Sequence, residues 1–547
     1  MKKKRLALPK HATVKLSVTV KRNLKNKYDP ASLTKIKTAI EKWIEADDKK
    51  RDIQTVHVAL DDSSEMLEVR HKYFPKAPRV RSISGKVTPV KIKRAIDQLW
   101  ERLKPKYLVL FGGDDVVPMF RVPNPTLYWR SGVTDWDRML PTDNPYATSK
   151  AFDPQDIDSY LVPDRVIGRI PDMKGSRKRT DPTWLVAYLE NATCWEPTSS
   201  DFYEKTYAIC TSEATGAAKE CMQFISKPVS DLLISPPTHD TLTSARNRLS
   251  APLHLIKCHG NRLDATFWGH DPNENNEKKA WKRAITSTTL KTRLKPATVV
   301  GTTCCWGAQI FSPDARHVRS HKRWPLASTY LRKGALGFVG ATGRAWFGGD
   351  TMRFADYIVG DYFKWILRHA SIGRALVESK HGYMCYYLEN GGTADALDQK
   401  TMVEYVLLGD PSIHPIAAKV SCPESKLDVQ ERTQRRAIHV RRAKEIQRLL
   451  PKRTAGSRVG AKDVFNKIKS KHALEEDVLK KLEKFDINPA GARVAKLETR
   501  VGNQTRKSLE YYWPGKRIGN EQTQTCLVRA ETDLDGNLYR AYVGYST

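Results

Sequence analysis

The sequence has no long apolar segment. Among its 547 residues no stretch approaches the roughly 18 consecutive apolar residues that a membrane-spanning helix needs. The N-terminus begins with lysines, but Pro9, Lys10 and His11 interrupt the apolar stretch that a secretory signal would require. We therefore expect no signal peptide and no membrane contact.

Cysteine pairs with disulfide or metal-binding spacing are also absent. The nine cysteines are an odd number, none lies in a C-x-x-C pattern, and Cys304 and Cys305 are adjacent. This spacing excludes a disulfide framework and a structural zinc site of the usual kind. We expect a reducing compartment, and hence a cytoplasmic protein.

Acidic residues are too few to balance the basic ones. The chain has 93 Lys and Arg against 61 Asp and Glu, a formal charge of +32. Such a positive field attracts polyanions, although no RNP-like motif, zinc finger or helix-turn-helix pattern accompanies it. A self-repelling soluble surface and a polyanion contact both account for the charge.

Composition and periodicity divide the chain into four regions. Residues 1–50 form a basic N-terminal segment, predicted as an edge strand and a helix. Residues 51–200 and 201–420 alternate short apolar runs with helical patterns, including a long one at 355–388, as expected of parallel sheets. Residues 421–547 are strongly basic, with helical patterns at 431–449 and 464–485 and strand patterns around an Asp-Gly turn at Asp535. The predicted fold is α/β, with two tandem subdomains and a smaller basic α+β C-terminal domain.

Two apolar runs end in reactive side chains. LHLIKCHG ends in His259 and Gly260, and TVVGTTCCWG ends in Cys304 and Cys305 before Gly307. The carboxyl ends of neighbouring parallel strands share one edge, where a histidine can accept the proton of a thiol. Buried core residues are the alternative. A zinc site built from both runs is disfavoured, because adjacent residues of a strand point to opposite faces.

Six blocks of the sequence, in order, resemble the gingipain-like cysteine peptidases, family C25 of the caspase-like clan. They lie between about residues 105 and 415 and read YLVLFGGDDVVP, DRVIGRIP, CHGN, TVVGTTCCWGAQIF, GALGFVGATGRAWFGG and VLLGDPS. The resemblance implies a caspase-like fold and a cysteine endopeptidase with a protein or peptide substrate. The expected thiol chemistry requires no cofactor, and we expect no metal at the site.

The resemblance also implies roles for the residues of the two runs. His259 matches the general base. The family's C-x-x-G pattern selects Cys304 as the nucleophile, because Gly307 follows three residues later, whereas the C-x-G pattern of caspases selects Cys305. The backbone N–H groups of Gly260 and Cys304 match the oxyanion site.

Three further residues match positions of the family. Glu213 in YAICTSEATG matches a glutamate that orients the histidine. Glu220 and Trp346 match the carboxylate and the lid of a pocket for a basic P1 side chain, which a carboxylate and an indole face can both bind. Asp231 and Asp264 are alternatives to Glu220.

The sequence departs from the secreted members of the family in several ways. It carries a charged stretch at 270–283, expected as a loop near the site, and a basic C-terminal domain that replaces an immunoglobulin-like one. We expect a zymogen of a bacterial stress or defence cascade, switched on by an activating protease or a regulatory protein, with a possible polyanion contact through the C-terminal domain. The alternative is a nucleic-acid-binding protein on an inactive caspase-like scaffold.

Overall fold

The computed structural model of the chain describes most residues between 13 and 417 and four strands beyond them. The described ranges are 13–128, 137–173, 180–290, 294–312, 323–389, 396–417, 493–501, 504–514, 525–532 and 538–546. No helix within these ranges is both long and apolar enough to cross a bilayer.

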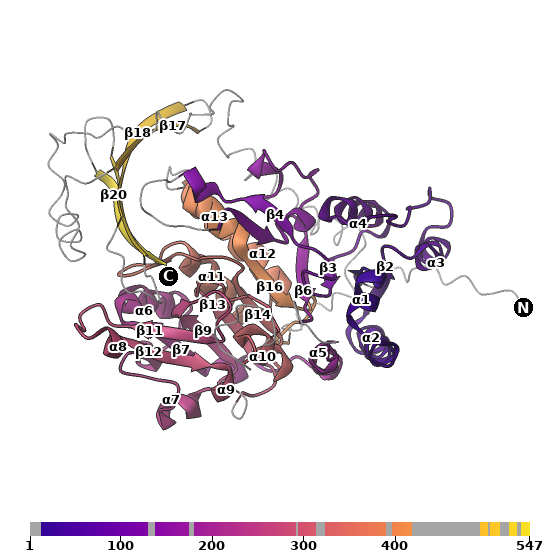
Figure 1. Cartoon of the computed structure of the whole chain (residues 1–547), viewed down its shortest axis with the longest axis horizontal. Coiled ribbons are helices and arrows are strands. Elements are labelled where there is room, and N and C mark those ends of the chain that lie inside the picture. Colours follow the sequence, from indigo (N-terminus) through magenta and orange to yellow (C-terminus); the bar gives the residue numbers. More distant parts are fainter. Residues whose placement is uncertain are drawn as a thin grey trace, which may run out of the picture.

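A ten-stranded sheet forms the centre of the protein (Figure 1). In spatial order its strands are β2 (Ile53–Ala59), β1 (Thr13–Thr19), β3 (Tyr107–Phe111), β6 (Val166–Ile170), β16 (Tyr405–Gly409), β14 (Gly337–Ala341), β13 (Val299–Thr302), β9 (Leu253–Lys257), β7 (Thr206–Thr211) and β8 (Leu232–Ser235). Neighbouring strands are parallel except β16 and β14, which are antiparallel. Two parallel halves of opposite direction therefore meet in one sheet, and the predicted α/β fold is confirmed.

Helices cover both faces of this sheet. On one face lies α10 (Leu326–Arg332), where the Tyr330 hydroxyl is 2.9 Å from Nδ1 of His254 in β9. On the other lies α11 (Ala355–Leu367), whose Val359 and Phe363 pack where Gly301 of β13 has no side chain. Further helices are α1 (Lys21–Lys27), α2 (Pro30–Arg51), α3 (Ser63–Tyr73), α4 (Pro89–Leu103), α5 (Thr183–Cys194), α6 (Thr215–Phe224), α7 (Thr243–Arg248), α9 (Ser287–Leu290), α12 (Ile372–Glu389) and α13 (Ala396–Glu404).

Two local expectations are wrong. The strand predicted near the N-terminus is not an edge strand, because β1 pairs with β2 on one side and β3 on the other. The helical pattern at 355–388 is not continuous, because α11 ends at Leu367 and α12 begins at Ile372. His369 between them has a φ of +66°, and this left-handed conformation cannot continue a right-handed helix.

The charged stretch at 270–283 is not a simple loop either. A small antiparallel sheet contains β10 (His259–Gly260), β11 (Thr266–His270) and β12 (Trp281–Thr286), with the short helix α8 (Glu277–Ala280) between the last two strands. The stretch is therefore a helical turn between two strands. The alternating residues at its ends, TFWGH and WKRAIT, carry the strand pattern.

A second antiparallel sheet joins the C-terminal region to the segment that follows β14. Its order is β15 (Phe347–Gly348), β20 (Leu538–Ser546), β19 (Thr525–Thr532), β18 (Gln504–Pro514) and β17 (Arg493–Val501). Phe347 pairs with Tyr545 and Gly348 with Gly544, and Figure 1 shows β20, in yellow, curving back toward the main body of the chain. The predicted helices at 431–449 and 464–485 and the turn at Asp535 lie outside the described residues.

Candidate active site

The residues expected at the site follow the carboxyl ends of four neighbouring strands. Glu213 follows β7, His259 follows β9, Cys304 and Cys305 follow β13, and Trp346 follows β14. These strands run in one direction, so their ends reach the same edge of the sheet. Four segments distant in sequence thereby come together.

Glu213 and His259 are in direct contact. Oε1 of Glu213 lies 2.6 Å from Nε2 of His259, and the two side chains are each 1% exposed. The Thr211 hydroxyl, at the end of β7, donates to the second carboxylate oxygen at 2.6 Å. The carboxylate is therefore fixed with one oxygen turned toward the imidazole.

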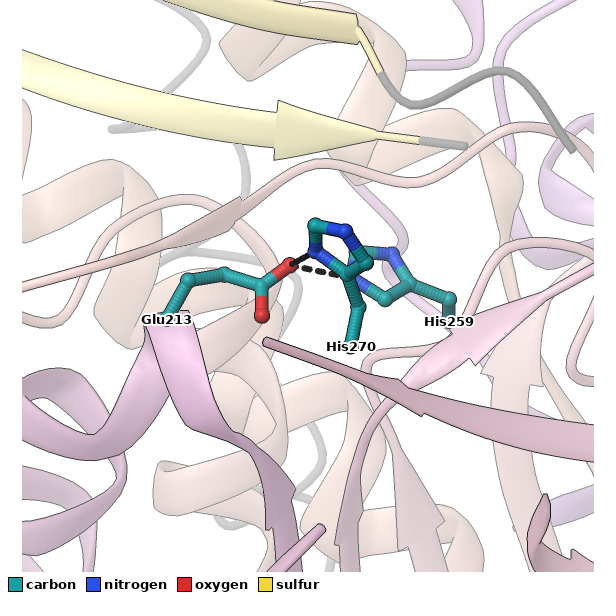
Figure 2. Close-up of side chains that lie close together, drawn as sticks. All are labelled: Glu213, His259 and His270. Atoms are coloured by element: carbon teal, nitrogen blue, oxygen red, sulfur yellow. Dashed lines mark hydrogen bonds and ion pairs between the residues drawn. The ribbon is translucent and has the colours of Figure 1, made fainter. Parts of the chain in front are cut away.

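A second histidine, which the sequence analysis did not select, shares this carboxylate. Nδ1 of His270 lies 3.4 Å from the same Oε1 of Glu213, and Figure 2 shows both imidazoles directed at it. The backbone N–H of His270 donates to Thr211 Oγ1 at 2.8 Å. His270 ends the alternating run TFWGH as His259 ends LHLIKCH, and that parallel could have identified it.

The charges of the site follow from its burial. Burial is the main influence on the pKa of His259 and lowers it, although the Glu213 carboxylate acts to raise it. Burial acts to raise the pKa of Glu213, but the charge and the hydrogen bond of His259 outweigh it and hold that pKa well below its usual range. A neutral imidazole beside an ionised carboxylate is suited to accept a proton.

The other ring nitrogen of His259 has no hydrogen-bond partner among the described residues. Aromatic rings surround the imidazole, with Trp281 at 5.3 Å and Phe347 at 5.5 Å between centroids. Lys257 lies 4.3 Å from the Phe347 ring and forms a buried ion pair with Asp356. His259 Nδ1 is thus the site's unengaged basic atom in the described part of the chain.

The two adjacent cysteines have different surroundings. Cys304 Sγ lies 3.9 Å from the carbonyl of Ile256, and burial raises the pKa of its thiol to about 12. Cys305 Sγ donates to the carbonyl of Ala345 at 3.3 Å, two residues before Phe347, which contacts His259. The two thiols are therefore directed at carbonyl groups of different segments, Ile256 in β9 and Ala345 after β14.

The expected oxyanion donors, Gly260 and Cys304, are both at the site. Gly260 packs so closely on Cys305 that an added Cβ would lie 2.0 Å from the Cys305 carbonyl oxygen. Only glycine fits this approach of two backbones. The Cys304 N–H donates to Thr302 Oγ1 at 3.1 Å, so this group must exchange its partner before it can bind an oxyanion.

Trp346 begins the segment 346–352, and Glu220 of α6 contacts the last residue of that segment. Glu220 is exposed on α6, and its carboxylate accepts from the backbone N–H of Met352 at 2.6 Å. Trp346 is fully buried, and its indole N–H has no partner among the described residues. The segment from Trp346 to Met352 therefore connects the two residues, with the indole packed inward.

One group of metal-ligating side chains in the described ranges has its ligand atoms close together. It consists of Glu213, His259 and His270, whose ligand atoms all lie within 4.8 Å of one another.

A histidine held by a carboxylate at the ends of parallel strands, with thiols at the end of the next strand, is the arrangement expected of a caspase-like cysteine peptidase. Residues 35–175 and 259–416 match the model of Peptidase family C25. These segments make up more than half of the 547 residues, and the chain belongs to peptidase family C25. No curated protein matches the chain. The predicted family and the predicted cysteine endopeptidase class are confirmed.

Proposed function

We propose that this peptidase cleaves its substrate with His259 as general base, Glu213 as the residue that orients it, and a thiol of the Cys304–Cys305 pair as nucleophile. His259 Nδ1 takes the thiol proton, the thiolate attacks the scissile carbonyl, and the imidazolium returns the proton to the leaving amine. Water then hydrolyses the thioester. The observation that carries the proposal is the 2.6 Å contact of Glu213 with Nε2, which leaves Nδ1 unengaged among the described residues.

The surroundings of the two thiols favour Cys305 as the nucleophile, although the C-x-x-G spacing favours Cys304. Cys305 contacts the segment that also packs on His259. The Cys304 thiol lies against the Ile256 carbonyl, and its raised pKa disfavours the thiolate.

Hydrolysis of fluorogenic peptides by matched alanine variants tests this assignment. We expect Cys305→Ala and His259→Ala to lose activity at least about a thousandfold, as loss of a triad member does, and Cys304→Ala to retain measurable turnover. If Cys304→Ala lost peptide hydrolysis and Cys305→Ala kept it, Cys304 would be the nucleophile. Equal turnover in all variants and wild type would remove the proposed mechanism.

We further propose a preference for Arg or Lys at P1, with Glu220 as the carboxylate that binds it. Two observations support this preference. The Glu220 side chain is exposed, and its hydrogen bond with the Met352 N–H connects it to the segment that carries Trp346 and Phe347. Glu220→Gln should lower kcat/KM for Arg peptides at least about tenfold, as loss of a charge-assisted contact does, and leave alanine peptides unchanged. Asp231→Asn is the matched control, since Asp231 pairs with Arg248 at 3.6 Å. An equal loss in both variants contradicts the proposal.

A cytoplasmic, regulated role is also proposed. The cysteines of the described residues form no disulfide, which supports a reducing compartment. Strand β20 pairs with β15, and Phe347 of β15 contacts His259. We propose that β20 holds the strand edge that an extended substrate would use, so that an activating protease or regulatory protein of a bacterial stress or defence cascade must release it.

Proline substitution in the full-length chain tests this restraint. Neighbouring residues of β20 direct their backbone groups alternately to β15 and β19, so Gly544→Pro/Tyr545→Pro removes a bond on the β15 side. We expect peptide hydrolysis to rise several-fold. The control is Glu498→Pro/Thr499→Pro on β17, the far edge of the same sheet. No rise in the first variant, or an equal rise in both, contradicts the restraint.

A further inference from the structure

We propose that Glu213, His259 and His270 form a binding site for a divalent transition-metal ion, zinc above all, and that zinc at this site inhibits the peptidase. The inhibition rests on the proposed function, whereas the binding does not. The three ligand atoms are a carboxylate oxygen and two imidazole nitrogens, all within 4.8 Å of one another. Two histidines and one glutamate are a known ligand set for zinc.

The distances suit capture of an ion with small side-chain movements. His259 Nε2 and His270 Nδ1 lie 2.6 and 3.4 Å from a single oxygen of Glu213, and Figure 2 shows the two rings converging on it. Zinc lies about 2.0–2.2 Å from such ligands. An ion would therefore replace the hydrogen bonds of that oxygen rather than require a new cavity.

Neighbouring groups already hold these ligands in place, as metal sites require. Thr211 donates to the second oxygen of Glu213 and accepts from the backbone N–H of His270. The Ser212 hydroxyl donates to the His270 carbonyl at 2.6 Å. The Trp281 ring lies 5.3 and 4.4 Å from the rings of His259 and His270, which restricts their rotation.

The choice of metal follows from the donors. Imidazole nitrogen suits zinc and its neighbours in the transition series, while magnesium and calcium select oxygen ligands. A bound ion would take Glu213 from His259 and withdraw electron density from the imidazole. His259 would then be a weaker base toward the thiol, so catalysis falls while the fold is kept.

Calorimetric titration of the full-length protein with zinc chloride tests the binding. We expect one site that Glu213→Gln and His270→Asn each weaken by about tenfold or more, and that Cys304→Ala/Cys305→Ala leaves intact. His71→Asn, on the exposed surface of α3, is the matched control. Equal affinity in His270→Asn and His71→Asn overturns the site, and so does loss of binding in the cysteine variant.

Hydrolysis of a fluorogenic peptide, with and without zinc, tests the inhibition separately. We expect the wild type to lose activity as the calorimetric site fills, and His270→Asn to need about tenfold more zinc for the same loss. Full wild-type activity with the site filled overturns the inhibition. Absence of hydrolysis without zinc, in every variant and also in the Gly544→Pro/Tyr545→Pro chain, removes the proposed function and with it the inhibition, while the calorimetric result still decides the metal site. Cobalt(II) in place of zinc adds an absorption spectrum that reports imidazole coordination even in a variant of low stability.

Discussion

Lys380 is a buried lysine that lies against β16, in the first half of the sheet. It lies on α12, and its Nζ donates to Asn144 Oδ1 at 2.7 Å and to the Tyr405 carbonyl at 2.8 Å. Burial lowers the pKa of Lys380 to about 7, although Asp143 and Glu404 act to raise it. Two neutral acceptors satisfy its hydrogen bonds without fully compensating its charge.

This lowered pKa makes stability depend on pH. In the unfolded chain a lysine titrates near 10.4, so between pH 7 and about 10 the unfolded state binds more protons than the folded state. The free energy of unfolding therefore rises with pH across that window, as far as this group contributes. Stability is lowest where Lys380 must be charged in both states.

Lys380→Met should flatten the rise between pH 7 and about 10, because the variant removes the titrating group. Urea unfolding at pH 7, 8.5 and 10 measures the slope for wild type and variant. Lys37→Met, at a position 78% exposed, is the control and should keep the wild-type slope. Parallel profiles for wild type and Lys380→Met would contradict the assignment.

At the scale of elements, one buried ion cluster joins three parts of the first half. Lys15 of β1 lies 2.6 Å from carboxylate oxygens of both Asp47 in α2 and Asp410 after β16, with all three side chains fully buried. The Trp43 indole donates to Asp410 at 2.9 Å and its ring lies 4.2 Å from Lys15 Nζ. The cluster fixes β1 and α2 against the turn that ends the matched family region.

Lys15→Met should destabilise the protein by about 3–5 kcal/mol, because it leaves the buried Asp410 carboxylate without its cation and leaves Asp47 paired with Arg51 alone. Chemical denaturation at pH 7 measures the change. The exposed pair of Lys37 and Glu41, 3.8 Å apart, supplies the control, and Lys37→Met should have little effect. A loss as small as that of the control would show that water enters the cluster in solution.

The sequence predicted those elements whose pattern is local. The run YLVLF is continuous and apolar, as buried parallel strands are, and it became β3 of the central sheet. The interior position of β1 was not predictable in this way, because it depends on pairing with β3, about ninety residues away. The break at His369 also lacked a local marker such as glycine or proline.

The same distinction between local patterns and distant contacts applies to the residues of the candidate site. His259, Glu213 and the cysteines could be selected because each follows an apolar run, and parallel strand ends converge. His270 was overlooked because its neighbours Asp271 to Lys279 read as a charged loop. The inward packing of Trp346 depends on contacts between distant segments, which no sequence pattern contains.

At the scale of the whole molecule, the charge of +32 should produce binding to polyanions. We propose such a contact through the basic C-terminal domain, whose 431–449 stretch lies outside the described residues. The chain should bind a DNA duplex at 50 mM salt and lose about 10³-fold or more in affinity by 200 mM if six or more phosphates are neutralised. Fluorescence anisotropy across a salt series measures the slope.

The matched comparison is Cys305→Ala, which should bind the duplex as the wild type does and have lost peptide hydrolysis. Affinity that is absent at 50 mM salt or constant from 50 to 200 mM contradicts the polyanion contact. Wild-type binding together with absent hydrolysis in both proteins would favour the nucleic-acid-binding alternative.

The pairing of β15 with β20 joins residues made at different times. Gly348 leaves the ribosome about 190 residues before β20 begins at Leu538, which at roughly 5–20 residues per second is an interval of about 10–40 s. The strands of the ten-stranded sheet are all synthesised by Gly409. Each newly made molecule therefore passes through a period in which its central sheet can be complete while β15 has no partner from β20, so the proposed restraint by β20 cannot act on the nascent chain during that period.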